Sequence, residues 1–399
     1  MNLHLTAQYA ILAFAAAKWA LAGSVVVPAA PATSSPAEAI AAPVQEWTIA
    51  GDRILVTNLV GRVTVGPASG DRIVVRVRLQ GKDSARLKVQ VEEGGDAELH
   101  VVYPLDEHHR YVYPEMSAGS RTQIGEWRPK SRSSGLQTML DAMSGRKVEV
   151  RGRAWGDALE AWADIEVLVP QGKPGTVRLG VGRIDAAGVR AALDLDTKSG
   201  SVAANDIAGD LLIDTGSGDV TARGVRGNVD IDTGSGSVDA EDLEGDGVII
   251  DTGSGMVSAR GVKARRVDID TGSGSVDATR IETLRLVIDT GSGEVNASEV
   301  RTANAEIDTG SGSVELDLVG MGLGRYLVDT GSGGVRMTVP ADVSARIRAS
   351  TGSGGIEVDL PAARVFRMSR NNVSLEVGGG ESEVIIDTGS GGIRISARR

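Results

Sequence analysis

Aspartates in one short motif are the residues of this chain whose type and spacing could do chemistry. The motif Asp-Thr-Gly-Ser-Gly occurs eight times, starting at Asp214, Asp232, Asp251, Asp270, Asp289, Asp308, Asp329 and Asp387. Two degenerate copies start at Asp196 and Ser350. Two aspartates that share one proton act as general acid and general base in hydrolysis. The question is whether two copies of the motif face each other.

Residues 212–217, two apolar residues followed by Asp-Thr-Gly-Ser, look like the active-site loop of aspartic proteases. That chemistry requires two such loops face to face across a pseudo-twofold axis. Here the starts from 196 to 350 are separated by 18, 18, 19, 19, 19, 19, 21 and 21 residues, so one structural unit is repeated. Copies in register along a repeat cannot converge on one water. We therefore expect the aspartates to be structural turn residues, with no catalytic residue and no enzyme activity.

The elements that position the motif are two short strands in each repeat. In residues 229–240 apolar and polar side chains alternate on both sides of the Gly-Ser-Gly turn, which is the period of half-buried strands. One repeat could bury only Val229, Ile231, Val238, Ala240 and Leu243, too little apolar surface to fold alone. The sequence predicts an all-β, single-domain parallel β-solenoid (β-helix) of about 18–21-residue coils over residues 179–399.

The turn has a predicted role for each of its residues. Gly would supply the positive φ of a tight turn. Alternation from Ile231 places Asp232 outside and Thr233 inside, which predicts an internal threonine ladder and an external aspartate ladder. A calcium-binding β-roll is an alternative solenoid, but it needs a Gly/Asp turn twice per coil, whereas the second turn here varies. We expect no cofactor and no metal site, with only weak Ca²⁺ binding by the acidic face.

Composition favours an exported protein. The 399 residues include no Cys and carry a net charge of −11, which disfavours nucleic acid as a partner because phosphate contacts require clustered Lys and Arg. Residues 1–29 contain an apolar run interrupted by Lys18 and read as a signal peptide or membrane anchor. Residues 30–46, rich in Ala, Pro and Ser, are predicted to be a disordered linker. The expected location is the periplasm, the cell surface or the medium.

Residues 47–178 form a less regular β region that we expect to cap the N-terminal end of the solenoid. It contains an insertion, residues 105–146, without a strand pattern. Residues 105–153 hold nine basic and six acidic residues, a local net charge of +3. The functional interpretation is a binding surface for an unknown protein or an acidic glycan, and its candidate residues are His108, His109, Tyr111, Tyr113, Trp127 and Arg128. The alternatives are a mobile insertion, or a cap whose aromatic side chains are core.

Several motifs resemble a bacterial family of proposed adhesins of unknown function with β-strand repeats, akin to the head-GIN domain adhesins. The matching elements are an early coil with Asn58, Gly61 and Val63, the Val-Pro element of residues 165–170, the Thr-Gly-Ser-Gly coils, and the Gly-rich residues 377–381 before a last coil. The resemblance covers about residues 47–399. It implies the solenoid fold and brings no catalytic residues with it.

Three classes of function follow. The first is a non-enzymatic exported repeat scaffold, an adhesin-like binding or structural module of the bacterial cell envelope. The second is a self-assembling β-helical filament former, because exposed strand edges at the ends of a solenoid invite end-to-end association. The strand at residues 392–396 is expected to be one such end, with Arg398 and Arg399 protecting its edge. The third is a polysaccharide-active β-helix enzyme, although residues 194–338 contain one aromatic residue, Tyr326.

Overall fold

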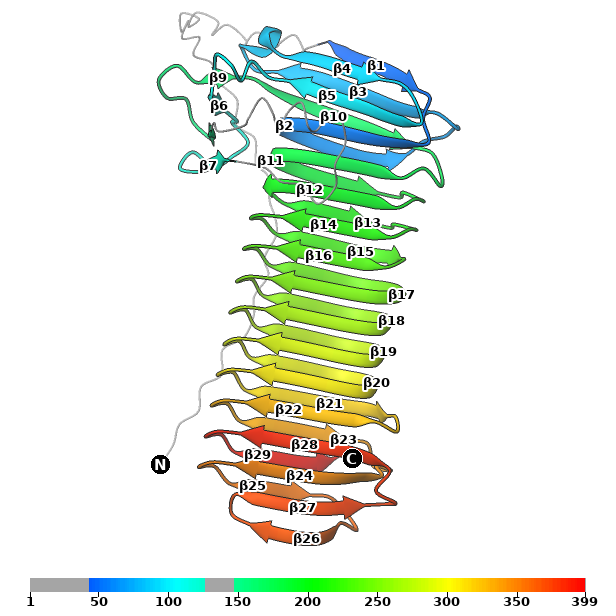
Figure 1. Cartoon of the computed structure of the whole chain (residues 1–399), viewed down its shortest axis with the longest axis vertical. Helices are drawn as coiled ribbons and strands as arrows, with labels where there is room; N and C mark the ends of the chain where they lie inside the picture. Colours follow the sequence, from blue (N-terminus) through cyan, green and yellow to red (C-terminus); the bar gives the residue numbers. More distant parts are fainter. Residues whose placement is uncertain (1–42, 126–146, 399) are drawn as a thin grey trace, which may run out of the picture. The chain divides into compact units, whose positions relative to one another are not determined.

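The computed structural model describes residues 43–125 and 147–398. Within these ranges the chain is all β apart from one 3-10 turn, η1 (Ser84–Arg86). Figure 1 shows the strands stacked as successive coils. The predicted all-β class and parallel solenoid are therefore confirmed. In the described part of the chain, no helix has the length and apolar character needed to cross a membrane.

Parallel strands in register form the coils. In the most regular coils a single strand of 15 residues bends round the corner opposite the Gly-Ser-Gly turn, as in β17 (Val238–Thr252), β18 (Val257–Thr271), β19 (Val276–Thr290) and β20 (Val295–Thr309). The other coil strands are shorter: β11 (Gly175–Ala187), β12 (Leu193–Ser199), β13 (Val202–Asn205), β14 (Leu211–Thr215), β15 (Val220–Arg226), β16 (Val229–Thr233), β21 (Val314–Met321), β22 (Arg325–Thr330) and β23 (Val335–Val339).

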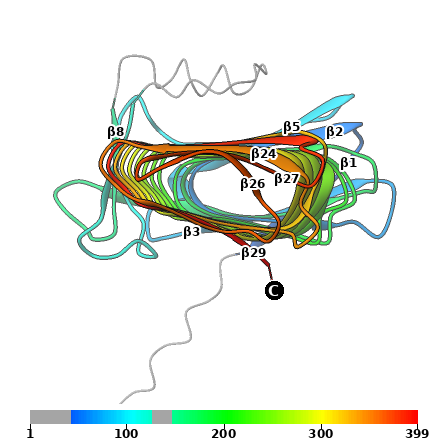
Figure 2. The same cartoon turned by 90° about the horizontal axis from the view of Figure 1, so that it is seen from below.

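The core consists of apolar columns that run along the stack. Val257 pairs with Val276, and Thr271 with Thr290, so equivalent side chains lie directly above one another. The side chains predicted to face inward, those of Val229, Ile231, Val238, Ala240 and Leu243, are at most 2% exposed. Figure 2 shows the flattened cross-section that encloses these columns. Period-two alternation was thus sufficient to predict which side chains are buried.

Stacking, rather than backbone conformation, requires the second glycine of most turns. A Cβ added at Gly274 would lie 1.6 Å from the carbonyl oxygen of Gly255 in the neighbouring coil. Positive φ at this turn position occurs at Gly200 and Gly218, but not at Gly274. The prediction of positive φ is therefore wrong for the regular coils, because the close approach of stacked turns is what excludes a side chain there. The opposite corner adopts positive φ instead, for example at Arg280 (58°).

Residues 44–125 and 147–169 form a wider end of the stack (Figure 1), which we call the head. Its strands are β1 (Val44–Ile49), β2 (Arg53–Pro67), β3 (Ile73–Gln80), β4 (Lys88–Glu92), β5 (Asp96–Val102), β6 (Arg110–Val112), β7 (Arg121–Ile124), β8 (Val148–Arg151), β9 (Leu159–Glu160) and β10 (Trp162–Val169). β1 begins at Val44, so residues 44–46 are not linker as predicted. They belong to the sheet because they pair with β3.

Antiparallel strands close the stack at the head. β2 pairs in parallel with β11 and so forms one more coil, and its other edge pairs with β5 and β10. β3 is antiparallel to β10, and β4 is antiparallel to β5. β1 is in turn antiparallel to β3. A second, small sheet has the strand order β7-β8-β6-β9.

The last coil of the sequence is inserted between two earlier coils. β28 (Ser382–Thr388) pairs with β22 on one side and with β24 (Ala345–Thr351) on the other. β29 (Ile393–Ala397) lies in the same way between β23 and β25 (Ile356–Asp359). The prediction that the strand at residues 392–396 ends the stack is therefore wrong. Arg398 does not guard an open edge, because its Nη1 donates to Asp317 Oδ2 at 2.9 Å.

Two antiparallel strands close the C-terminal end of the stack instead. β27 (Asn372–Val377) is antiparallel to β24, and β26 (Arg364–Ser369) is antiparallel to β27. Figure 2 looks onto this end and shows β26 running across the opening of the coils. Both ends of the parallel stack are thus closed by antiparallel strands.

Candidate functional site

The threonine of the motif forms hydrogen bonds that join neighbouring turns. Thr290 is fully buried, and its Oγ1 donates to the carbonyl oxygen of Gly274 at 2.9 Å. The same Oγ1 accepts a hydrogen bond from the N–H of Gly293 at 3.0 Å. Equivalent pairs of bonds occur in other coils, for example at Thr271 and Thr309. The predicted internal threonine ladder is therefore present, and these hydroxyls are hydrogen-bonded within the turns.

The motif aspartates form a single file, which we call the aspartate column. Asp251 pairs with Asp270, Asp270 with Asp289, and Asp289 with Asp308, each at the spacing of adjacent parallel strands, about 4.8 Å. Partial burial and the charges of Asp251 and Asp289 raise the pKa of Asp270. All these carboxylates point out from one face, so neighbours do not face each other as the aspartates of a protease do. The arrangement therefore differs from the pair of facing aspartates that shares one proton in a protease.

Different residues end the aspartate column on its two sides. At the head side, Asp196 pairs with Arg178, which is 2% exposed. At the other side, Asp387 pairs with Ser350, whose hydroxyl donates to Asp387 Oδ1. Arg178 Nη1 also donates to Asp194 Oδ1 at 2.7 Å. A positive charge therefore compensates the first carboxylates of the column.

The aromatic side chains of the insertion belong to the core. Tyr111 is fully buried and Tyr113 is 2% exposed. Tyr111 packs edge to face against Tyr103 at 5.4 Å between ring centroids, and Tyr113 packs against Trp162 at 6.0 Å. Burial raises the pKa of both tyrosines well above the usual range. These rings support the cap, one of the alternatives left open by the sequence, and β6 and β7 show that the insertion does contain strands.

The remaining predicted binding residues lie in different surroundings. His108 Nε2 lies 3.0 Å from Arg86 Nη1, and His109 is partly buried with its Nδ1 atom enclosed and without a hydrogen-bond partner. Trp127 and Arg128 lie outside the described residues. Among the described residues, no group of three His, Cys, Asp or Glu side chains has the arrangement of a metal site.

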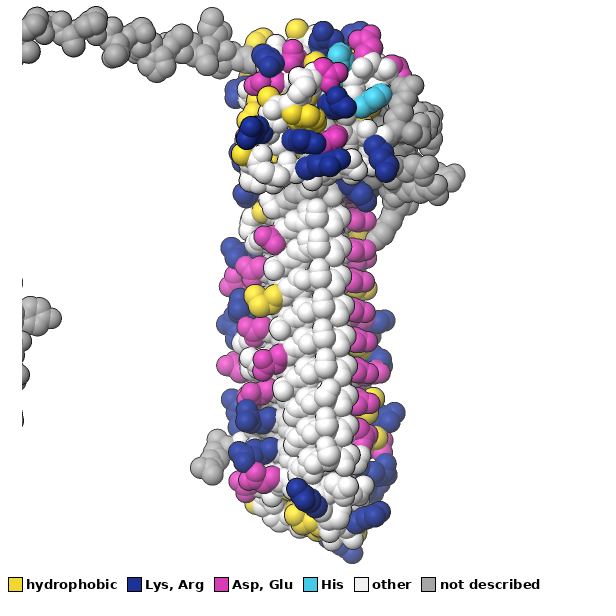
Figure 3. All heavy atoms as spheres, turned by 90° about the vertical axis from the view of Figure 1, so that its left-hand side faces the viewer, with side chains coloured by type: hydrophobic (Ala, Val, Ile, Leu, Met, Phe, Trp, Pro, Cys, Tyr) yellow, Lys and Arg dark blue, Asp and Glu magenta, His cyan; other side chains and the backbone are white. Residues whose placement is uncertain are grey.

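Exposed arginines lie on the surface of the small sheet of the head. Arg110 and Arg121 are 54% and 52% exposed, and they form ion pairs with Asp157 at 2.9 Å and with Glu149 at 2.7 Å. The guanidinium of Arg151 lies 4.5 Å from the ring centroid of Trp155. Figure 3 shows Lys, Arg and His side chains gathered on the head, above a ridge without charged side chains along the coils. Trp155 was not among the residues predicted from the sequence, because it lies beyond the insertion, residues 105–146.

A groove of about 750 Å³ lies along the variable corner of the later coils. Its lining includes Glu282, Leu284, Arg301, Leu323 and Asp342. The groove has carboxylates, but none of its lining residues is aromatic. Sugar platforms of polysaccharide-active enzymes usually need such rings. Tyr326 cannot serve as one because its side chain is fully buried, with its hydroxyl donating to the Thr302 carbonyl at 2.7 Å.

Three solved structures give the following comparisons. A proposed cell-adhesion protein from Clostridium sporogenes ATCC 15579 is 10% identical, with 89% of this chain and 99% of that chain covered and a TM-score of 0.19. A proposed adhesin from Bacteroides fragilis NCTC 9343 is 10% identical, with coverage of 88% and 96% and a TM-score of 0.28. A proposed lipid-binding protein from Parabacteroides distasonis ATCC 8503 is 14% identical, with coverage of 88% and 96% and a TM-score of 0.28.

At these TM-scores the likeness carries no argument about function. No protein among those with curated functions is significantly similar to this chain. A family model, Toastrack DUF4097, matches residues 223–396, a range that includes the regular coils and the inserted last coil. The match agrees with the β-strand repeat family that the motifs resemble. Residues 223–396 of this chain are therefore similar to the Toastrack DUF4097 family.

Proposed function

We propose that the protein is a non-enzymatic, exported, adhesin-like binding module of the bacterial cell envelope, in which the coils are a rigid spacer and the head binds the partner. The observation that supports this most directly is the use of the repeated motif. Its threonines are hydrogen-bonded between turns, and its aspartates stand in single file. The proposal requires neither a metal nor a cofactor.

The head is the proposed binding part because it carries the side-chain types that dominate binding energy. Arginine and tryptophan are enriched among such residues. Strands of the small sheet carry Arg110, Arg121 and Arg151, and Trp155 lies between its strands β8 and β9. The coil ridge instead shows neither charged nor hydrophobic side chains (Figure 3). An acidic glycan or an acidic protein of the envelope fits the arginines by charge.

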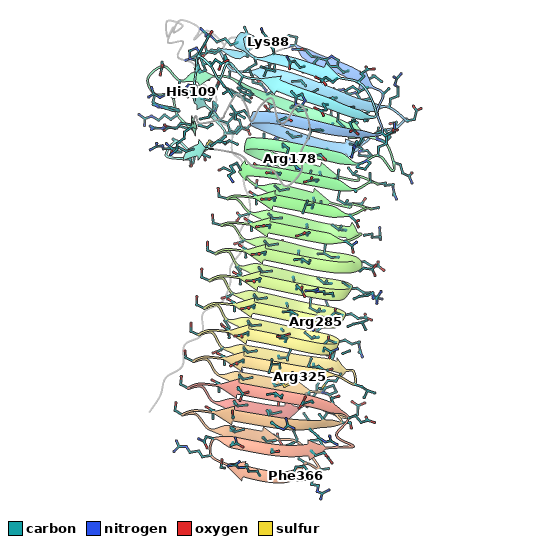
Figure 4. The ribbon with its side chains drawn as sticks, in the orientation of Figure 1. Lys88, His109, Arg178, Arg285, Arg325 and Phe366 are labelled. Carbon is teal, nitrogen blue, oxygen red and sulfur yellow. The ribbon has the colours of Figure 1, made fainter. Side chains whose placement is uncertain are left out.

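The test measures binding of the full chain to heparin, to pectate and to intact bacterial cells. Arg110→Ala combined with Arg121→Ala should weaken binding on the order of tenfold, and Trp127→Ala with Arg128→Ala tests the two candidates outside the described residues. The matched control is Arg285→Ala with Arg325→Ala, two arginines that Figure 4 labels on the coils. Equal losses in the control and the head variants would contradict recognition by the head.

A further inference from the structure

The outermost strand at the C-terminal end, β26, exposes apolar and basic side chains together. All six residues of β26 are exposed, including Val365 at 49%, Phe366 at 57% and Met368 at 64%. Figure 4 labels Phe366 at this end and Lys88 at the opposite end. Large apolar side chains this exposed occur at few other described positions, and of these Leu284 and Leu323 line the groove described above. We call Arg364, Val365, Phe366, Arg367, Met368 and Arg370 the tip.

Positive charge surrounds the apolar side chains of the tip. Arg364, Arg367 and Arg370 are exposed, and no acidic residue occurs between Asp359 and Glu376. The nearest carboxylate along β27, that of Glu376, already accepts a hydrogen bond from Arg346 Nε at 3.2 Å. The guanidinium of Arg364 lies 5.2 Å from the ring centroid of Phe366. The chain as a whole has a charge of −11, so this basic end contrasts with the rest of the molecule.

The tip is held firmly by the coils beneath it. The N–H of Thr351 donates to the Asn371 carbonyl at 3.0 Å, and the N–H of Ile356 donates to the Arg370 carbonyl at 3.2 Å. These bonds tie the turn between β26 and β27 to both strands of the coil formed by β24 and β25. The exposed side chains therefore project from a fixed support.

We propose that the tip docks on an anionic lipid surface, with Phe366, Met368 and Val365 entering the interface and the three arginines contacting lipid phosphates. Apolar side chains beside Lys and Arg are the combination that binds such surfaces. Addition of a partner strand to the free edge of β26 fits less well, since the register of β26 shifts between Val365 and Arg367. A bulge of this kind disturbs the flat hydrogen-bonding edge that strand addition requires. This inference is independent of what the head binds.

The test uses the full chain with vesicles of phosphatidylcholine, with and without phosphatidylglycerol. Cosedimentation should be stronger with phosphatidylglycerol, and each of Arg364→Gln, Arg367→Gln and Arg370→Gln should lower it on the order of fivefold at low salt. Phe366→Ser with Met368→Ser should lower it at least as much. The matched control is Leu284→Ser, whose leucine is 56% exposed on the side of the coils and whose loss should change nothing.

A site-specific probe separates the tip from any other part of the chain that enters vesicles. The chain has no Cys, so Ser369→Cys and Leu284→Cys can each be labelled with an environment-sensitive dye. Anionic vesicles should shift the emission of the label at position 369 and leave the label at 284 unchanged. An unchanged label at 369, equal responses at both positions, or binding that the tip variants do not weaken would overturn the proposal. If the emission of the label at 369 changes with protein concentration in the absence of vesicles, the tip is an interface between copies of the chain. That result would also overturn the proposal.

Discussion

Arg178 occupies the position directly beside Asp196, at the head end of the aspartate column. The two residues are paired across the parallel β11–β12 ladder, and Arg178 Nε lies 3.6 Å from Asp196 Oδ2. Burial acts to lower the pKa of Arg178, but the hydrogen bond with Asp194 and the charges of Asp194, Asp196 and Asp214 raise it overall. The guanidinium thus stays charged where the line of carboxylates begins.

Arg178→Met should destabilise the fold by about 3 kcal/mol, at the lower end of the range for breaking a buried ion pair, because Asp194 keeps some solvent contact. Urea unfolding would measure the change. The double variant with Asp194→Asn should be less destabilised than the two single losses added together. Arg183→Met is the control, since its arginine is 50% exposed and pairs with Asp185 at the surface. A loss of stability in the control as large as in Arg178→Met would show that burial of the Arg178 charge is not the cause of the loss.

Asp270→Asn should raise stability at neutral pH. Partial burial, followed by the charges of Asp251 and Asp289, raises the pKa of Asp270 above its ordinary value of 3.8. The stability from this group is therefore present below pH 3.8 and is lost as pH rises through the raised pKa. Since most of the side chain is in contact with solvent, the gain should be about 0.5 kcal/mol at pH 7 and should vanish in acid.

Thermal unfolding at several pH values would measure this difference in stability between the variant and the unmodified protein. Asp277→Asn is the matched control, because Asp277 accepts a hydrogen bond from Arg260 Nη2 at 3.3 Å and lies outside the column. It should gain no stability at neutral pH. If Asp270→Asn destabilises the protein at neutral pH, the repulsion within the column is not the dominant effect.

Thr290→Val should destabilise the protein by about 2 kcal/mol, because valine keeps the shape but leaves the Gly274 carbonyl and the Gly293 N–H without their partner. Thr290→Ser retains the hydroxyl and should lose less. Chemical denaturation of both variants would show the difference. Equal stability of the valine and serine variants would mean that the two hydrogen bonds of the hydroxyl contribute no more than the packing of the methyl group.

Repetition explains what could be predicted from the sequence. The coil length, the inward Thr233 and the outward Asp232 all follow from a period of two repeated at a fixed spacing. The position of the last coil in the stack could not be predicted in this way. Asp387 begins the same motif as Asp329, so its coil would fit between any two coils. The burial of Tyr111 and Tyr113 could not be predicted either, because their segment lacks a strand pattern long enough to show which side chains point inward.

Deleting residues 251–269, one full period, should leave a folded chain with one coil fewer. The deletion brings Asp270 next to Asp232 in the register that Asp251 now holds. Coils contact mainly their neighbours, so the rest of the stack should keep its pairing. Deleting residues 251–259 instead breaks the period and should abolish the cooperative unfolding seen by circular dichroism. Loss of β structure after the full-period deletion would show that the coils are not interchangeable.

The inserted last coil predicts a specific pattern of cross-links. Asp387 is paired with Asp329 on one side and with Ser350 on the other. Adjacent parallel strands bring paired Cα atoms to about 4.8 Å, within the range for a disulfide, whereas two strand spacings exceed it. Because the chain has no Cys, Asp329→Cys with Asp387→Cys should cross-link on mild oxidation. Asp329→Cys with Ser350→Cys should not, although these two copies of the motif are consecutive in the sequence. The reverse result, read by peptide mapping after proteolysis, would place the coils in simple sequence order.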